Sequence, residues 1–388
     1  MTSIPLPKGV TGISATPKRQ EYLVNLFYHS SGYILRAPGK ELVATAATTG
    51  CRGAATWYVD QNAYFVIGDT LYQLDSSESL TSIGTIEGSA DCDFSVGQVN
   101  LVIIVKGGKG YFYNADNGLN EITDTDYQPS DSVDFIDGRH LFIPSDGSPA
   151  FYSEIDNPDN INPLNFFDAE ELPDLNRVTI NISNNEYIGG NESFEIYRSS
   201  GSEVAPFSRR EGARVDTGYV SGIERYKSSF MFIGRDRDQS YAVHLMSQGS
   251  TQIISNDAIN ELLNVEYSAS ELSAVNSYSY VWKGVQFVGW NLRRHTIEFS
   301  DGNWSYRDSN LDGTTLGPWS GKGIAFAHGR YYVGDSVTGN IGKLVDDPGE
   351  YGEKVEYELQ TFVRGLRQSY FSPSELMLDA RTGIDGST

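Results

Sequence analysis

A few short groups of residues have types that could support chemistry, and their spacing decides what each can do. Gly107-Gly108-Lys109-Gly110 has the composition of a phosphate-binding loop. A P-loop, however, reads G-x-x-x-x-G-K-[ST] and opens a helix, whereas apolar strand-like runs flank this loop on both sides. We therefore interpret it as a hairpin turn. The G-x-S-x-G elbow of serine hydrolases is absent from the sequence.

Metal ligation was considered for two groups of side-chain oxygens, which suit calcium. Asp156, Asp159 and Asn160 form one group, and Asp236 and Asp238 form the other, but neither completes the D-x-[DN]-x-[DN]-G loop. No two histidines stand at ligand spacing on one predicted element; they are His29, His140, His244, His295 and His328. The sequence predicts no metal, no cofactor and no catalytic residue.

Glycoside cleavage would need paired carboxylates or a tyrosine nucleophile with arginines. Sialidases also carry repeated S-x-D-x-G-x-x-W boxes, and the nearest match here, Ser300-Asp301-Gly302-Asn303-Trp304, has the wrong spacing and occurs once. We expect no enzyme. A carbohydrate-binding or glycoside-cleaving protein stays the alternative function if Trp282, Trp304 and Trp319 are exposed; burial in the core is the other fate of such rings.

Charge separates further function classes. The 388 residues carry 29 Lys and Arg against 51 Asp and Glu, a net charge of −22, spread over most of the chain. Binding of nucleic acid by counterion release needs clustered cations, so this balance argues against it. The acidic surface either keeps the protein soluble or repels phosphate. The basic clusters either pair with local carboxylates or dock acidic neighbours; they are Arg209-Arg210 with Arg214, Arg293-Arg294, and Arg364 with Arg367.

The elements that position these residues recur along the chain. The clearest unit covers residues 323–344, where Ile324, Phe326, Tyr331 and Val333 alternate with small or polar residues around a Gly-Arg turn, as in antiparallel strands. Similar units begin near Ala54, Asp93, Val133, Val178, Ile223, Ala274 and Ile324. A spacing of about 45 residues is typical of four-stranded propeller blades, which must close into a ring to cover their faces. We predict an all-β protein, a β-propeller of about seven blades, with six or eight as alternatives.

Three regions are expected. Residues 1–50 form an extended N-terminal arm and the first strands, residues 51–347 form the propeller, and residues 348–388 form a C-terminal β extension, with strands at 355–362 and 375–378, or an incomplete second domain. An irregular insert, rich in Asn, Pro and Asp, interrupts the repeat at 156–174, and residues 256–263 are the best helix candidate. The arm is expected to pack on a partner or neighbour.

Cysteine use and hydropathy bear on the compartment. Cys51 and Cys92 lie about one repeat apart and are expected to be reduced, buried thiols on adjacent blades, which fits a cytosolic origin. The N-terminus lacks the apolar stretch of a secretion signal. The longest apolar run, 99–105, is far too short to span a bilayer and is interpreted as an inner blade strand.

An ordered series of motifs in the middle of the chain resembles one known family. The series is Asp137-Gly138-Arg139, Gly147-Ser148-Pro149 with Phe151-Tyr152-Ser153, Asn165-Phe166-Phe167-Asp168-Ala169-Glu170 with Pro173-Asp174, the run 189–197, and Pro206-Phe207-Ser208-Arg209-Arg210-Glu211-Gly212-Ala213. Together with residues 22–25 and 31–39, it is similar to the packaged DNA stabilisation proteins, the tail accessory factors or nozzle proteins of short-tailed bacteriophages. The likeness covers roughly residues 20 to 365.

The resemblance implies a virion protein of the phage tail, assembled in the cytoplasm of the bacterial host. It implies a propeller subunit in a homo-hexameric ring below the portal and its adaptor ring, with tail needle, spike or fibre proteins attached and no catalytic residues. The ring would extend the channel, retain the packaged genome and pass it at ejection without sequence-specific binding or membrane insertion. We expect assembly contacts at the interruptions of the repeat: Asp156, Asp159, Phe166, Phe167, Glu170, Glu171, Asp174, Arg209, Arg210 and Arg214.

Overall fold

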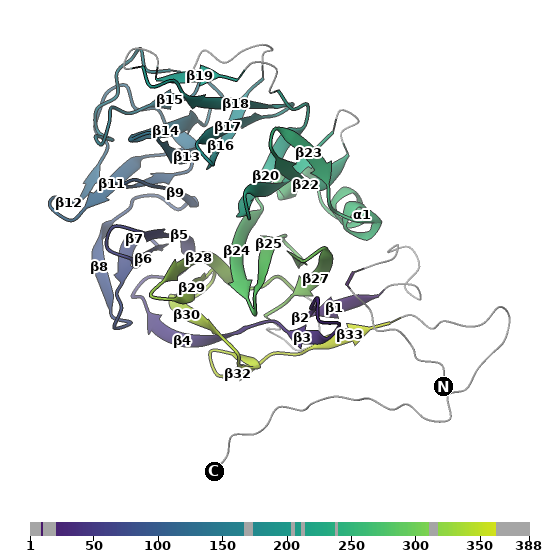
Figure 1. The fold of residues 1–388 in the computed structure, drawn as a ribbon. Coiled ribbons are helices and arrows are strands. Elements are labelled where there is room, and N and C mark those ends of the chain that lie inside the picture. The colour runs from purple at the N-terminus through teal and green to yellow at the C-terminus, as the bar shows by residue number, and fades with distance from the viewer. Residues whose placement is uncertain are drawn as a thin grey trace, which may run out of the picture.

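The chain folds into seven β-sheets arranged as blades around a central axis (Figure 1). This computed structural model describes residues 9–10, 21–166, 174–202, 206–210, 214–236, 240–309 and 317–361. Six of the seven predicted unit starts fall inside the innermost strand of a blade, and Ala274 lies just before one. The all-β propeller and its seven blades are confirmed.

The first five blades follow the chain in order, and blade 3 has one strand fewer than the others. Their strands, from the axis outward, are β5 (Cys51–Trp57), β6 (Asn62–Ile67), β7 (Thr70–Leu74) and β8 (Leu80–Thr85); β9 (Cys92–Val96), β10 (Leu101–Val105), β11 (Gly110–Asn114) and β12 (Gly118–Glu121); β13 (Ser130–Ile136), β14 (Arg139–Pro144) and β15 (Phe151–Tyr152); β16 (Asn176–Ile182), β17 (Asn185–Gly190), β18 (Phe194–Ser199) and β19 (Phe207–Arg209); β20 (Gly218–Tyr226), β21 (Ser229–Arg235), β22 (Tyr241–Ser247) and β23 (Ser250–Ile253).

Blades 6 and 7 are extended to six strands by the two ends of the chain. Blade 6 has β24 (Asn276–Trp282), β25 (Val285–Asn291), β26 (Thr296–Ser300), β27 (Asn303–Arg307), β1 (Tyr22–Val24) and β33 (Glu358–Gln360); blade 7 has β28 (Gly321–Ala327), β29 (Arg330–Asp335), β30 (Asn340–Val345), β4 (Gly39–Thr45), β31 (Gly349–Glu350) and β32 (Glu353–Lys354). A separate hairpin joins β2 (Leu26–Tyr28) to β3 (Ile34–Arg36).

Seven clusters of buried apolar residues lie between neighbouring blades, so the core is distributed around the ring. Each sheet is therefore covered on both faces, which explains why β10 is buried at every residue and has no alternation. The prediction of an inner blade strand in this run is confirmed. Tight hairpins at Asp137-Gly138 and His328-Gly329 have positive φ at both residues, as two-residue type I′ turns require.

The ring closes where β4, from the N-terminal part, pairs with β30 of blade 7. β4 precedes the predicted propeller start at residue 51, and β31 and β32, which follow its predicted end at 347, extend the same sheet. This closure stabilises the ring. Blade 7 cannot separate from blade 1 unless β4 is pulled out of the sheet of blade 7. The predicted strand at 355–362 is present as β33, while 362 and 375–378 lie outside the described residues.

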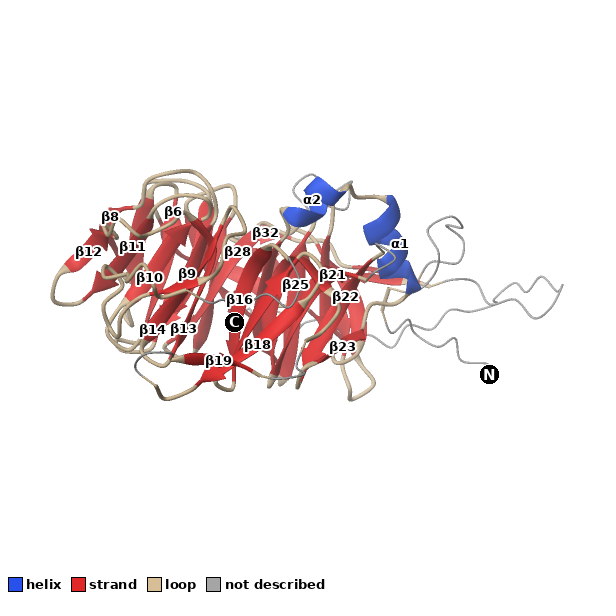
Figure 2. Cartoon of the chain, turned by 90° about the horizontal axis from the view of Figure 1, so that it is seen from above, coloured by secondary structure: helices blue, strands red, loops and turns tan. Residues whose placement is uncertain are grey.

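Two short helices, α1 (Asp257–Val265) and α2 (Ala269–Ser273), lie on one face of the ring between blades 5 and 6 (Figure 2). α1 confirms the helix expected at 256–263, and its N-cap Asn256 accepts a hydrogen bond from the Ile259 amide. The described part of the arm, Gly9 and Val10, packs on blade 6 of the same chain: the Val10 amide donates to the Trp304 carbonyl at 2.8 Å. Within the described ranges, no helix is long and apolar enough to span a membrane.

A buried group of charged and polar side chains lies where blades 6 and 7 meet. We call it the closed rim, and it consists of Lys40, Trp319, Ser320, Asp335 and Glu350. Lys40 is 1% exposed, and its Nζ lies 2.6 Å from Ser320 Oγ, 3.0 Å from Glu350 Oε2 and 3.7 Å from Asp335 Oδ2. Trp319 Nε1 donates to Glu350 Oε1 at 2.7 Å. Residues about 300 positions apart thus share one charge network, which no local pattern could have predicted.

Candidate functional site

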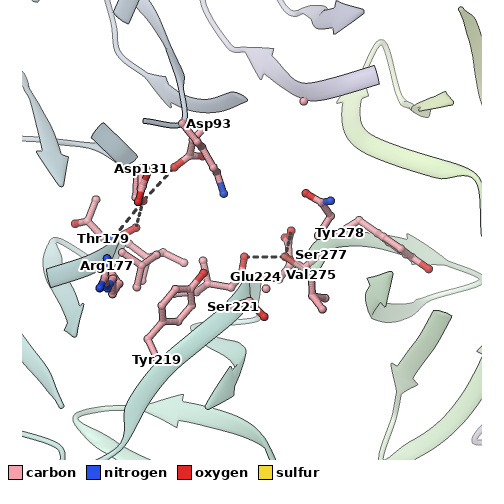
Figure 3. A pocket seen from close by; sticks show the side chains of 18 of the residues that line it. Asp93, Asp131, Arg177, Thr179, Tyr219, Ser221, Glu224, Val275, Ser277 and Tyr278 are labelled. Atoms are coloured by element: carbon pink, nitrogen blue, oxygen red, sulfur yellow. Dashed lines mark hydrogen bonds between the residues drawn. The ribbon is translucent and has the colours of Figure 1, made fainter. Parts of the chain in front are cut away.

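The seven innermost strands β5, β9, β13, β16, β20, β24 and β28 line an axial channel with a volume of about 920 Å³ (Figure 3). These strands run parallel around the axis, so the channel has one end where they all begin and another where they all end. The second residue of every inner strand lines this channel: Arg52, Asp93, Asp131, Arg177, Tyr219, Ser277 and Lys322. The wall is polar, and most of the blade packing lies farther out.

Carboxylates in the wall join successive blades. Asp93 Oδ2 accepts hydrogen bonds from Ser132 Oγ at 3.0 Å and from the Val133 amide at 3.1 Å. Asp134 repeats this arrangement one blade on: its Oδ2 accepts from the Asn181 amide at 2.6 Å and from Arg225 Nη2 at 2.9 Å. An aspartate that accepts amide bonds from the next inner strand fixes the spacing of the two blades, which is a structural role.

Two glutamates near the wall have pKa values above the usual value for a glutamate. Burial raises the pKa of Glu224 to about 7, although Ser277 Oγ donates to its carboxylate at 3.1 Å. Glu186, behind β16, is fully buried and accepts from Thr179 Oγ1, and burial raises its pKa well above the usual value. Both carboxyl groups therefore hold a proton to a higher pH than an exposed glutamate does, because burial disfavours the charged form.

At the end where the inner strands finish, several large apolar side chains are exposed. Exposed large hydrophobic residues occur at or just after the ends of four inner strands: Tyr58, Val59, Val99, Val281 and Phe326. Phe326 packs against Tyr331 with ring centroids 4.7 Å apart. Asp137, Lys227 and Lys283 are exposed in the hairpin turns at the same end, so this face carries both apolar and charged groups.

The predicted assembly residues fall on blades 3 and 4, and the three aspartates among them have structural partners. Asp159 Oδ1 accepts from the Thr123 amide at 2.5 Å and the Asp124 amide at 3.0 Å. The carbonyl of Asp156 accepts from Asn100 Nδ2 at 2.9 Å, and Asp174 Oδ2 accepts from the Ser193 amide at the same distance. The carboxylates of Asp159 and Asp174 hold loops in place, whereas Asp156 uses its backbone carbonyl and its side chain is exposed.

Phe166 lies at the outer edge of blade 3, where a fourth strand would stand. It forms an isolated bridge with Phe151 and is 49% exposed, and the adjacent Leu164 is 77% exposed. Phe151 and Phe166 line an apolar cavity of about 320 Å³ together with Pro149, Ile161 and Pro163. We call the edge formed by Phe151, Leu164 and Phe166 the open rim. The predicted residues Phe167, Glu170 and Glu171 lie outside the described part of the chain.

The basic candidates mostly pair with nearby carboxylates. Arg209 lies 3.2 Å from Glu195 on the neighbouring strand of blade 4, and Arg214 lies 3.2 Å from Asp216. Arg210 is exposed, with its amide bonded to the Ile196 carbonyl. Arg293 and Arg294 face Glu271 at 3.1 and 4.0 Å. Arg364 and Arg367 lie outside the described residues. Of the alternatives weighed for these clusters, local pairing holds for Arg209, Arg214, Arg293 and Arg294.

Other sequence candidates are placed in structural surroundings. Trp304 and Trp319 are 3% and 2% exposed and Trp282 is half-buried, so these rings form no exposed saccharide platform. Cys51 and Cys92 are free and buried on adjacent blades, as predicted, and burial raises the pKa of each thiol to about 12. Within the described residues no group of three or more His, Cys, Asp and Glu could hold a metal ion; Asp238 lies outside them.

Sequence reasoning missed the charged lining of the channel. A signal was present, because the repeat places Arg52, Arg177 and Lys322 at the same position in three different units. That equivalence is not visible in the sequence, because it depends on the residue at which each strand begins. β-Bulges shift the register by one residue in several blades.

Comparison with known proteins gives a family and a fold. Residues 2–348 match the protein-family model described as "Bacteriophage P22 Gp10, beta-propeller". No curated protein sequence matches this one significantly. Among solved structures, the extracellular domain of a putative hybrid two-component system from B. thetaiotaomicron is 11% identical, with a TM-score of 0.52, over 79% of this chain and 39% of that one.

Two further solved structures match most of this chain. PorZ from Porphyromonas gingivalis is 9% identical, with a TM-score of 0.45, over 83% of this chain and 39% of that one. The Cps50 (Swd1) propeller from Myceliophteria thermophila is 10% identical, with a TM-score of 0.49, over 79% of this chain and 100% of that one. At 11% identity, the similarity to the B. thetaiotaomicron domain bears on the fold alone.

Proposed function

Because the chain belongs to the Bacteriophage P22 Gp10 β-propeller family, a packaged-DNA stabilisation family of phage structural proteins, we propose that it forms a ring in the tail of a short-tailed phage. In this proposal six copies assemble below the portal and its adaptor ring. The ring extends the DNA channel, retains the packaged genome and carries needle, spike or fibre proteins. The family role is structural, and no catalytic step is assigned to the chain.

The family match, which covers 347 of the 388 residues as the span 2–348, is the observation that carries this proposal. The shape of the subunit supports it. A closed ring of identical copies needs two different, complementary surfaces on opposite flanks of each subunit. The open rim on blade 3 and the chain ends on blades 6 and 7 lie on opposite sides of the propeller axis (Figure 1).

The open rim has the properties of a subunit contact. Leu164 and Phe166 are exposed beside an apolar cavity, and the sheet edge next to them carries a strand of only two residues, β15. Exposed apolar groups beside an unfinished sheet are a liability unless a partner covers them. The aspartates Asp159 and Asp174 would then serve to hold the loops of this surface in place.

The acidic character of the chain supports passage of DNA. With a net charge of −22, a lumen formed by six copies would be lined mainly by carboxylates, which do not hold phosphates by ion pairs, so DNA would slide during ejection. A six-fold particle whose lumen is lined by Lys and Arg would contradict this part of the proposal.

The test is assembly of the purified protein with its adaptor partner, followed by two-dimensional electron-microscopy class averages. We expect six-fold rings from the wild type and loss of rings from Leu164→Asn with Phe166→Asn, because the change places polar groups in a buried contact. Val265→Asn, at an exposed valine on α1, is the matched control and should leave the rings unchanged. A wild-type chain that stays monomeric beside its adaptor would contradict the proposal.

A further inference from the structure

The axial channel is basic in an acidic chain. Its lining contains six Lys and Arg residues and four carboxylates: Arg52, Lys106, Arg177, Arg225, Arg235 and Lys322 against Asp93, Asp131, Asp134 and Glu224. In the whole sequence the order is reversed, with 29 cations against 51 carboxylates. The lining of the channel therefore carries net positive charge, whereas the chain as a whole is negative. Solubility does not require cations to gather in a channel.

These charges are sorted along the axis. Five of the six cations belong to the end where the inner strands begin, which we call the start mouth: Arg52, Lys106, Arg177, Arg235 and Lys322. Asp131 and Asp93, each the second residue of its inner strand, are the lining carboxylates nearest that mouth. Asp134 and Glu224 lie farther along their strands, deeper in the channel. An anion is attracted to the start mouth and repelled from the interior.

β-bulges turn several of these side chains toward the axis. Five of the seven inner strands have a register shift in their first few residues, and in three of them the extra residue is itself charged: Arg52, Asp131 and Arg177. A bulge changes the direction of the side chain that it inserts, and it removes a hydrogen bond between the paired strands. Because of this cost, bulges are common next to functional sites. Here they gather at one mouth.

Three of the five mouth cations bind carboxylates or backbone carbonyls through their charged groups, and the other two form no ion pair among the described residues. Lys322 pairs with Asp91 at 2.5 Å, Arg235 with Glu192 at 3.0 Å, and Arg52 donates to three backbone carbonyls. Lys106 is exposed, and neither it nor Arg177 forms an ion pair with any described residue. Arg177 uses Nε to donate to Asn191 Oδ1 at 3.2 Å, which orients the guanidinium and leaves its other donors for a ligand.

We propose that the start mouth binds a small oxyanion, with Arg177 and Lys106 as its direct ligands and with Lys322 and Arg235 adding to the local field. The group recognised is a phosphate or a carboxylate, since a guanidinium fork fits either one bidentately. Asp131 lines the same mouth and weakens the binding by repulsion. The anion stops at the mouth, because the carboxylates deeper in the wall exclude it. This inference is independent of ring formation.

The test measures binding of inorganic phosphate to the purified chain by calorimetry, with ionic strength held constant by sodium chloride. Arg177→Gln should weaken binding about tenfold or more, and Lys106→Gln, at an exposed position that folding does not need, should weaken it several-fold. Asp131→Asn should strengthen it. Arg198→Gln and Lys354→Gln, at exposed cations outside the channel, are the controls and should have no effect.

Opposite signs for Asp131→Asn and Lys106→Gln cannot come from general destabilisation, so the pair of variants keeps the proposal testable if Arg177→Gln folds poorly. Acetate and a short acidic peptide distinguish carboxylate from phosphate as the preferred group, and either preference supports the site. The proposal is overturned if the wild type binds none of these anions, if Lys106→Gln and Asp131→Asn bind as the wild type does, or if only duplex DNA binds.

Discussion

The closed rim on blades 6 and 7 and the open rim on blade 3 finish their sheets in opposite ways. At the closed rim both ends of the chain add strands, and Lys40 is buried against two carboxylates and a tryptophan. At the open rim the sheet stops at three strands, and Leu164 and Phe166 face solvent. The difference separates two tasks within one repeat: the closed rim holds the ring together, and the open rim is left for contact.

The two rims differ because different segments of the chain are available to cover the outer sheet edge of each blade. The innermost strand of each blade is an edge strand that lines the narrow channel, and every blade has a second edge at its periphery. Blades 6 and 7 cover theirs with chain ends, and these ends bring charged groups that are stable in the interior only as a complete network. On blade 3 the insert holds loops through Asp159 and Asp174, and it leaves Leu164 and Phe166 exposed while Ile161 is buried.

The largest expected effect breaks the closed rim. Lys40→Ala should lower the free energy of unfolding by about 3–5 kcal/mol, because it leaves Glu350 and Asp335 buried without their cation. Urea unfolding measures the change. Lys354→Ala, at an exposed lysine of β32 on the same blade, should stay within about 0.5 kcal/mol of the wild type. A loss below about 1 kcal/mol for Lys40→Ala would show that the closed rim does not hold the ring.

A smaller effect sharpens the account of the same rim. Trp319→Phe removes the hydrogen bond from Nε1 to Glu350 Oε1 and should cost about 1–3 kcal/mol beyond the loss of ring area. Trp282→Phe is the matched variant on blade 6, because the buried Nε1 of Trp282 has no hydrogen-bond partner among the described residues. Thermal and urea unfolding of the two variants should differ clearly. Equal losses would mean that packing, and not the bond to Glu350, explains the role of Trp319.

The smallest effect concerns the open rim. Leu164→Ser should change the free energy of unfolding of the isolated chain by no more than about 0.5 kcal/mol, because a side chain that is 77% exposed has little burial to lose. Urea unfolding at a concentration where the wild type is monomeric is the appropriate measurement. A loss of about 2 kcal/mol or more would mean that Leu164 supports the fold, and the contrast between the two rims would then fail.

Local patterns were sufficient for most of the fold. Alternation in β28 and the turn residues around it are short-range properties, so the unit, its recurrence and the count of seven blades could be predicted. The burial of Cys51 and Cys92 on adjacent blades followed from their spacing of one repeat. The helix α1 was visible because Asn256 caps it and its apolar face has helical spacing.

The sites were harder to predict because they depend on contacts between distant parts of the chain. The sequence predicted assembly contacts in the insert that contains Phe166, but it could not show that the carboxylate of Asp159 accepts hydrogen bonds from the amides of Thr123 and Asp124. It also could not show that Arg209 and Arg214 are paired with Glu195 and Asp216. Side-chain partners are chosen by the folded geometry, and several carboxylates compete for each arginine in so acidic a chain.

By itself, the sequence determined the repeating unit and therefore the class of fold, because strand alternation and turn chemistry act over a few residues. Only the tertiary structure decided which strand closes the ring, which residues share the closed rim, and which charges meet at the start mouth of the channel. Lys40 and Glu350 stand far apart along the chain and 3.0 Å apart in space. Ring closure brings such groups together, and no short-range preference of either residue encodes that meeting.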